Sequence, residues 1–165
     1  MDRRLLVISF SHRRRAEHFV SSLTRLVDEG ALVIDDLVYV HKGKGGTAVI
    51  TETNEISTGR AATVGATAGF VLGLVLAVPF AGMAVGAGAA ALIAKLRDSG
   101  ISDEFLHDVR DELDNGRIAV ALLISHSDEE QVRAEISKHS GGTYIAGDLD
   151  DDAIAALQEA LDAGN

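Results

Sequence analysis

The stretch IAVALLI, residues 118–124, decides the fold class of this chain. Every residue in it is apolar, whereas Arg117 precedes it and Ser125 and His126 follow it. An uninterrupted apolar run of this length is typical of a strand that is covered on both faces. The sequence therefore predicts a sheet with residues 118–124 as a central strand.

Short apolar or β-branched runs predict four further strands. They lie at residues 5–10, 32–41, 47–53 and 143–146. The segment KGKGG between the second and third supplies residues that tolerate positive φ, so it predicts a hairpin connection.

Apolar residues at helical spacing predict helices in the remaining segments. Ser11 is the expected cap of the first helix, which Gly30 ends, and Ser102 caps a second, which ends at Asn115–Gly116. Ser127 and Glu130 form a capping-box pattern for a third helix, and Asp150 begins a fourth. The inward-facing positions are Ala16, Phe19, Val20, Leu23, Leu26, Val27, Phe105, Leu106, Val109, Leu113, Val132, Ile136, Ile154, Leu157 and Leu161.

These elements give the order β-α-β-β-α-β-α-β-α around one apolar insertion. The first six match the split βαβ, ferredoxin-like plan, in which an antiparallel sheet carries helices on one face. We therefore predict an α+β fold. It comprises a βαββ half at residues 1–58, a glycine-zipper helical hairpin at 59–97, and an αβαβα half at 98–165 that completes the same domain. The remaining helices, the insertion or a second subunit must cover the sheet's other face.

The insertion carries no charged side chain from Ala61 to Ala94. Pro79 lies near its middle and would break a continuous helix, so two shorter arms are expected. Small residues recur every four positions on each arm, which predicts a smooth groove where another backbone packs closely. These packing positions are Gly65, Gly69, Gly73, Pro79, Gly82, Gly86 and Ala90. The basic flanks are Arg60, Lys95 and Arg97.

Two environments fit this hairpin. Each arm is short for a perpendicular membrane crossing, which needs about 20 apolar residues. The tip, Val78-Pro79-Phe80, has no polar side chain for the far headgroup region. A hairpin in or on a bilayer, with both folded halves in the cytoplasm according to the positive-inside tendency, and a soluble hairpin buried between subunits therefore both remain open.

The layout resembles the bacterial and archaeal "domain of unknown function 1269" family. The resemblance is carried by LLVISF, by the junction from STGRAATVG to SGISDEF, by AVALLI and by GGTYIAGDLDDDAIAALQEAL. It implies a predicted membrane protein with a glycine-rich apolar hairpin. No catalytic residue comes with it.

Composition excludes several function classes. The net charge is −10, from 25 acidic and 15 basic residues, which disfavours a general nucleic-acid binder because phosphate contacts need clustered cations. The one basic cluster is small: Arg13, Arg14 and Arg15, with Arg3 and Arg4 nearby. The chain has no cysteine, so it has no disulfide, thiolate metal site or cysteine nucleophile.

No motif predicts an active site or a metal centre. The histidines are His12, His18, His41, His107, His126 and His139, and no pair has the spacing of a helix-borne metal site, so they are expected at surfaces or caps. The acidic tract at 148–152 lacks the central glycine of a calcium loop. KGKGG does not open a helix as a P-loop does. Ser9, Ser11 and His12 lack a nucleophile elbow.

We therefore predict a non-enzymatic, membrane-associated homo-oligomer that assembles through the hairpin, with membrane lipid as a second partner. It is expected to bind no nucleic acid, metal or cofactor. Two alternatives stay open. One is a cytoplasmic soluble scaffold or cage with the hairpins buried between subunits, and the other is a ferredoxin-like module that senses a small ligand.

Overall fold

The computed structural model describes residues 3–43, 48–52, 94, 97–98, 101–139 and 143–149. For residues 48–52, 129 and 143–149 it describes the backbone alone. The predicted hairpin, apart from residues 94 and 97, and the predicted helix after Asp150 lie outside the described residues.

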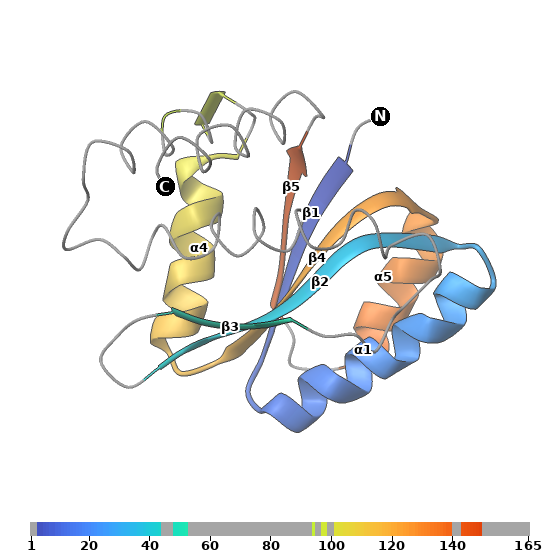
Figure 1. Cartoon of the computed structure of the whole chain (residues 1–165), viewed down its shortest axis with the longest axis horizontal. Coiled ribbons are helices and arrows are strands. Elements are labelled where there is room, and N and C mark those ends of the chain that lie inside the picture. Colours follow the sequence, from blue (N-terminus) through green and yellow to red (C-terminus); the bar gives the residue numbers. More distant parts are fainter. Residues whose placement is uncertain are drawn as a thin grey trace.

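The described strands form one five-stranded sheet with the order β3-β2-β4-β1-β5, and every neighbouring pair is antiparallel. The strands are β1 (Arg3–Phe10), β2 (Leu32–Lys42), β3 (Ala48–Glu52), β4 (Ile118–Ser127) and β5 (Thr143–Leu149). The described helices are α1 (Arg13–Asp28), α4 (Asp103–Asp114) and α5 (Glu129–Lys138). The fold is therefore mixed α+β (Figure 1).

Strand β4 is the central strand, as the run IAVALLI predicts. It lies between β2 and β1, and Leu122 is in register with Leu37 on one side and Leu6 on the other. No residue from Ile118 to Ile124 is more than 6% exposed. Because β2 pairs with β4, the chain on the two sides of residues 53–100 contributes to one sheet.

Two crossover connections each join a pair of parallel strands that have one antiparallel strand between them. Strands β1 and β2 are both antiparallel to β4, so they run parallel to each other with β4 between them, and α1 connects them. In the same way β4 and β5 run parallel with β1 between them, and α5 connects them. Among the described strands, β3 pairs with β2 alone and forms an edge.

This connectivity differs from the prediction that the first six elements form the split βαβ plan. The crossovers pass through β1, α1, β2, β4, α5 and β5, leaving β3 and α4 as additions. Helices α1 and α5 pack together on one face, whereas α4 lies across the other (Figure 1). The assignment of the plan to the first six elements was wrong, because the order of strands along the chain does not determine which strands pair.

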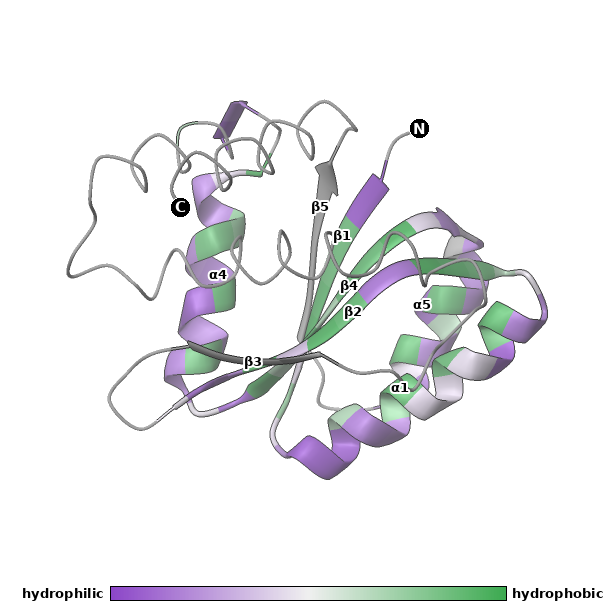
Figure 2. Cartoon of the chain, viewed as in Figure 1, coloured by the Kyte–Doolittle hydropathy of each residue, from purple (hydrophilic) through white to green (hydrophobic). Residues whose placement is uncertain are grey.

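Residue alternation explains how both faces are filled. Leu6, Ile8 and Phe10 of β1 join the core cluster that includes Phe19 and Leu23 of α1. The alternate residues of β1 and β4 point the opposite way, toward α4. They are Leu5, Val7, Ser9, Ala119, Ala121 and Leu123, and none is more than 2% exposed. Hydrophobic residues accordingly lie on the sheet-facing sides of α1 and α4 (Figure 2).

The helix ends confirm some predicted caps and correct others. Gly30 and Gly116 have φ values of 73° and 75°, so each occupies the left-handed conformation that favours glycine after a helix. Ser102 accepts a hydrogen bond from the Phe105 backbone N–H at 3.1 Å, as predicted. The first helix is instead capped at His12 with no side-chain cap bond, so the predicted Ser11 cap was wrong.

The predicted cap at Ser127 was wrong by one residue. Asp128 is the N-cap of α5, and its carboxylate accepts hydrogen bonds from the backbone N–H groups of Glu130 and Gln131. Strand β4 continues through Ser127, and aspartate caps a helix as well as serine does. The sequence contains both residues in succession, so the pattern alone did not separate them.

The two serines make a matched pair for testing these caps. Ser102→Ala is expected to lower the free energy of unfolding by about 1 kcal/mol, because the Phe105 N–H loses its acceptor. Ser11→Ala should cause a much smaller change, since Ser11 caps nothing. Urea unfolding of both variants measures the difference, and equal losses would contradict the assignment.

Candidate functional site

Most of the predicted packing positions lie outside the described residues. They are Gly65, Gly69, Gly73, Pro79, Gly82, Gly86 and Ala90, together with the basic flanks Arg60 and Lys95. Arg97 is described: its side chain is 57% exposed, and its Nε lies 2.7 Å from Oδ1 of Asp103 in the first turn of α4. An ion pair this exposed contributes little stability. Within the described ranges, no helix has both the length and the apolar character needed to cross a bilayer.

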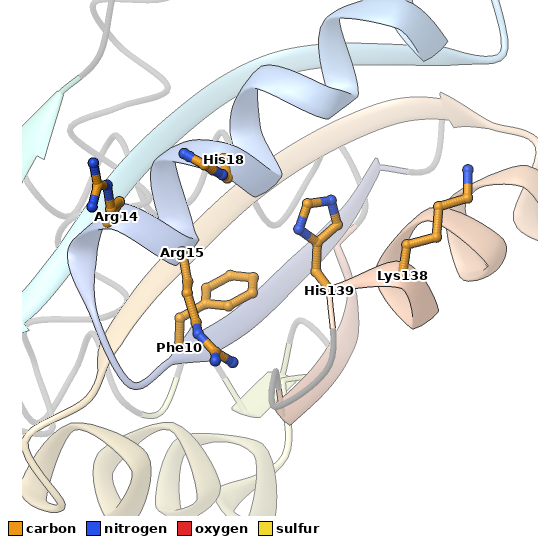
Figure 3. Close-up of a pocket in the computed structure, with 6 residues that line it drawn as sticks. All are labelled: Phe10, Arg14, Arg15, His18, Lys138 and His139. Atoms are coloured by element: carbon orange, nitrogen blue, oxygen red, sulfur yellow. The ribbon is translucent and has the colours of Figure 1, made fainter.

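A cavity of about 250 Å³ lies between the start of α1 and the end of α5. We call it the basic pocket. Its lining residues are Phe10, Arg14, Arg15, His18, Lys138 and His139. In Figure 3, Arg15, Phe10 and His139 gather between the two helices, while Arg14 and His18 follow α1 and Lys138 lies on α5. Among the described residues, no acidic side chain lines this pocket.

Aromatic contacts fix the inner wall of the basic pocket. Phe10, at the end of β1, is 1% exposed, and its ring centroid lies 5.3 Å from that of Phe19. His139 meets the Phe19 ring edge-on, with centroids 5.5 Å apart. Such tilted and edge-to-face pairs are favourable arrangements of aromatic rings. The His139 imidazole is therefore held by packing at the rim of the cavity.

A buried carboxylate joins the two helices beside this pocket. Glu135 of α5 is 4% exposed. It accepts hydrogen bonds from Lys138 Nζ at 2.8 Å and from Arg25 Nη2 of α1 at 3.1 Å, and His139 Nε2 lies 3.5 Å from its other oxygen. The hydrogen bond from Lys138 lowers the pKa of Glu135 most, burial opposes it, and Ser22 and Arg25 lower it further, to about 2.

This carboxylate makes stability depend on pH. Because its pKa falls from an ordinary 4.5 to about 2 on folding, its contribution is present above 4.5 and is lost as the pH falls toward 2. Glu135→Gln is expected to cost about 2 kcal/mol at neutral pH, since Arg25 and Lys138 lose a charged acceptor. Acid unfolding curves should also be flatter for this variant. Asp108→Asn, at an exposed position on α4, is the control, and equal curves for both would contradict the role of Glu135.

The serine at the end of β1 has a structural setting. Ser9 is 0% exposed. Its hydroxyl donates to Glu112 and accepts from Arg117 Nε at 3.0 Å, while Arg117 Nη2 donates to the Ser9 carbonyl at 3.0 Å. These bonds tie β1 to the end of α4, and they bring neither Ser11 nor His12 to Ser9.

Metal ligands do not gather in the described part of the chain. No group of three or more histidine, aspartate or glutamate side chains there has the proximity to hold a metal ion. His12 and His139 stand at helix ends, as N-cap and C-cap. Most of the acidic tract at 148–152, and residues 44–47 of the predicted hairpin connection, lie outside the described residues.

Sequence reasoning noted the three arginines of α1 but missed the basic pocket. Its two walls are more than a hundred residues apart in the chain, and they meet because α1 and α5 cover the same face of the sheet. The signal was present as basic residues at the start of one helix and at Lys138-His139, the end of another. Only the connectivity brings the two together.

Comparison with known proteins identifies one relationship. A family model described as "Protein of unknown function (DUF1269)" matches residues 62–162. The match confirms the family resemblance inferred from the sequence, over a span that includes the apolar insertion but not β1 or α1. No curated protein and no solved structure matches the chain.

Proposed function

We propose that this chain, which belongs to the DUF1269 family of proteins of unknown function, is a non-enzymatic, membrane-associated homo-oligomer that assembles through residues 59–97. The carrying observation is that the sheet already has helices on both faces, α1 and α5 on one and α4 on the other. The sheet therefore does not need the charge-free residues from Ala61 to Ala94 to cover its two faces. Apolar surface of that extent needs lipid or another protein surface.

The connectivity supports a ferredoxin-like interpretation of the domain. The strand order β5-β1-β4-β2, with crossovers through α1 and α5, supports the split βαβ plan. In this interpretation β3 and α4 are additions, and residues 53–102 enter between them. The insertion then interrupts neither crossover, so it is free to serve assembly while the domain keeps its own core.

The spacing of small residues supports close packing within or between hairpins. Gly65, Gly69 and Gly73 recur every four residues, and so do Gly82, Gly86 and Ala90. Each glycine costs a water-exposed helix about 1 kcal/mol relative to alanine. Glycines in register are therefore best explained by a backbone that approaches them closely. Arg60, Lys95 and Arg97 would then lie at the boundary of the apolar segment, with the folded halves in the cytoplasm.

Membrane fractionation of the untagged protein tests the lipid environment. The proposal predicts that the protein stays with membranes at low and high salt, because apolar burial is not screened by ions. A protein found wholly in the soluble fraction under both conditions would overturn membrane association.

A soluble self-assembling scaffold is the second candidate, and the apolar tip Val78-Pro79-Phe80 favours it. A tip that crossed a bilayer would have to rest among polar headgroups without a polar side chain, whereas a tip buried between subunits meets apolar surface. In that case the protein is soluble without detergent and the hairpins bury one another.

A ligand-sensing module is the third candidate, and the basic pocket is the observation that favours it. Such a module should show a saturable, ligand-dependent rise in melting temperature, because a ligand that binds only the folded state stabilises it. This role is compatible with either mode of assembly.

A further inference from the structure

We propose that the basic pocket between α1 and α5 binds a phosphate group carried by a small organic molecule or by a lipid headgroup. This inference does not depend on how residues 59–97 assemble, because the lining residues all belong to the folded domain.

The charge of the lining identifies an anion as the ligand. Arg14, Arg15 and Lys138 carry permanent positive charge at the pH of a cell, and two imidazoles stand beside them. The chain as a whole has a net charge of −10. The positive charge of this lining is therefore opposite in sign to that of the whole chain. Glu135 lies behind the rim and binds Lys138, but it is already shared with Arg25 of α1. Among the described residues that line the pocket, none carries a negative charge.

The placement of donors on two walls favours a phosphate over a carboxylate. Arg15 and His139 lie toward the space between the helices, whereas the side-chain ends of Arg14 and Lys138 point away from it (Figure 3). Arginine and histidine donors come from the first two turns of α1, and lysine and histidine donors come from the opposite wall at the end of α5 (Figure 3). A phosphate monoester has three terminal oxygens and a charge of about −1.5 to −2, so it accepts from both walls at once. The α1 N-terminus favours the same charge and the α5 C-terminus at the opposite wall disfavours it, so the two helix dipoles do not decide the ligand.

The inner wall limits the rest of the ligand. Phe10 closes the inner end of the cavity, and because it is 1% exposed it has almost no ring surface for an organic group to cover. A volume of about 250 Å³ is below the range of about 300–1,000 Å³ that is typical of pockets for drug-sized ligands. The pocket therefore fits a phosphate with a small substituent.

Two arginines of one helix turn allow a matched test. Arg15 lines the basic pocket. Arg13 does not: it lies over the Tyr39 ring at 5.3 Å and pairs with Glu17 at 2.8 Å. Arg15→Gln and Arg13→Gln therefore remove the same charge from the same turn, but only the first removes a donor from the pocket.

Calorimetric titration of the full-length protein with phenyl phosphate is the first measurement. We expect saturable binding that Arg15→Gln weakens about tenfold or more, the effect of losing one charge-assisted hydrogen bond. Arg13→Gln should change the affinity little. Circular dichroism confirms that both variants are folded.

Vesicle binding separates the two sources of the phosphate. Phosphatidylcholine vesicles with and without phosphatidic acid are compared at one ionic strength, for the parent protein and both variants. Binding that rises with phosphatidic acid and needs Arg15 but not Arg13 assigns a lipid headgroup, whereas binding of phenyl phosphate alone assigns a soluble ligand. The proposal is overturned if neither probe binds, or if the two variants weaken binding equally.

Phosphate binding by the basic pocket is expected to be independent of assembly through residues 59–97. Leucine at Gly69 and Gly73 should leave phenyl phosphate binding intact even where it changes the particle size. Arg15→Gln should lose phosphate binding and keep the particle size. The glycine variant should keep phosphate binding and change the particle size. These opposite results distinguish the two proposals.

Discussion

Replacing both Gly69 and Gly73 with leucine is expected to abolish assembly, so that particles formed by the parent protein fall to the mass of a single chain or aggregate. Both positions lie on the predicted small-residue side of the first arm. Leucine there fills the groove and holds the partner backbone away. The change adds apolar surface and no charge, so loss of assembly cannot be attributed to lost hydrophobicity. Light scattering, in detergent if the parent needs it, measures the result.

Val71→Leu with Val75→Leu is the matched control. These valines lie roughly opposite Gly69 and Gly73 on a helix, where added bulk meets lipid or a looser protein surface. The control should keep the parent particle size. Assembly that survives leucine at both glycines, or that both double variants disrupt equally, would contradict a glycine groove.

The second large effect is expected at the centre of the sheet. Ala121 is 0% exposed, and it is in register with Val7 on β1 and Val38 on β2. By alternation it points toward α4. Ala121→Phe would therefore force α4 away from the sheet, at a cost of about 3 kcal/mol, the upper end of what overpacking costs.

Urea unfolding of Ala121→Phe and of Val33→Phe makes the comparison. Val33 is a strand residue that is 43% exposed, so a ring there has room in solvent. We expect a large loss of unfolding free energy for Ala121→Phe and a small change for Val33→Phe. Similar values for both would mean that α4 does not pack against this face.

The elements of the fold were predictable where side chains decide the structure locally. The run from Ile118 to Ile124 identified the central strand because both of its faces are buried. The apolar positions of α1 and α4 were also correct, since a helix buries one side whatever it packs against. Gly30 and Gly116 marked helix ends because their positive φ values favour glycine.

The arrangement of these elements was not predictable in the same way. Nothing in the local sequence of α4 says which face of the sheet it covers, and only its contacts with β4 and β5 in the folded chain place it there. Neighbouring residues with similar capping ability, Ser127 and Asp128, left the start of α5 ambiguous by one position.

The basic pocket was beyond sequence reasoning for a related reason. Arg14 and His139 belong to segments that have no local relation, and only the shared face of α1 and α5 brings them to one cavity. The predicted glycine-zipper hairpin is not tested by the described structure. Residues 59–97, apart from 94 and 97, lie outside the described structure, so the hairpin stays a prediction from small-residue spacing and from Pro79.

We expect residues 59–97 to be covered by lipid or by other copies of the chain. The particle mass of the full-length protein, prepared without detergent and measured by light scattering, tests this expectation most directly. We expect either particles of several chains or no soluble protein until detergent is added. A stable, soluble monomer in the absence of detergent would contradict it.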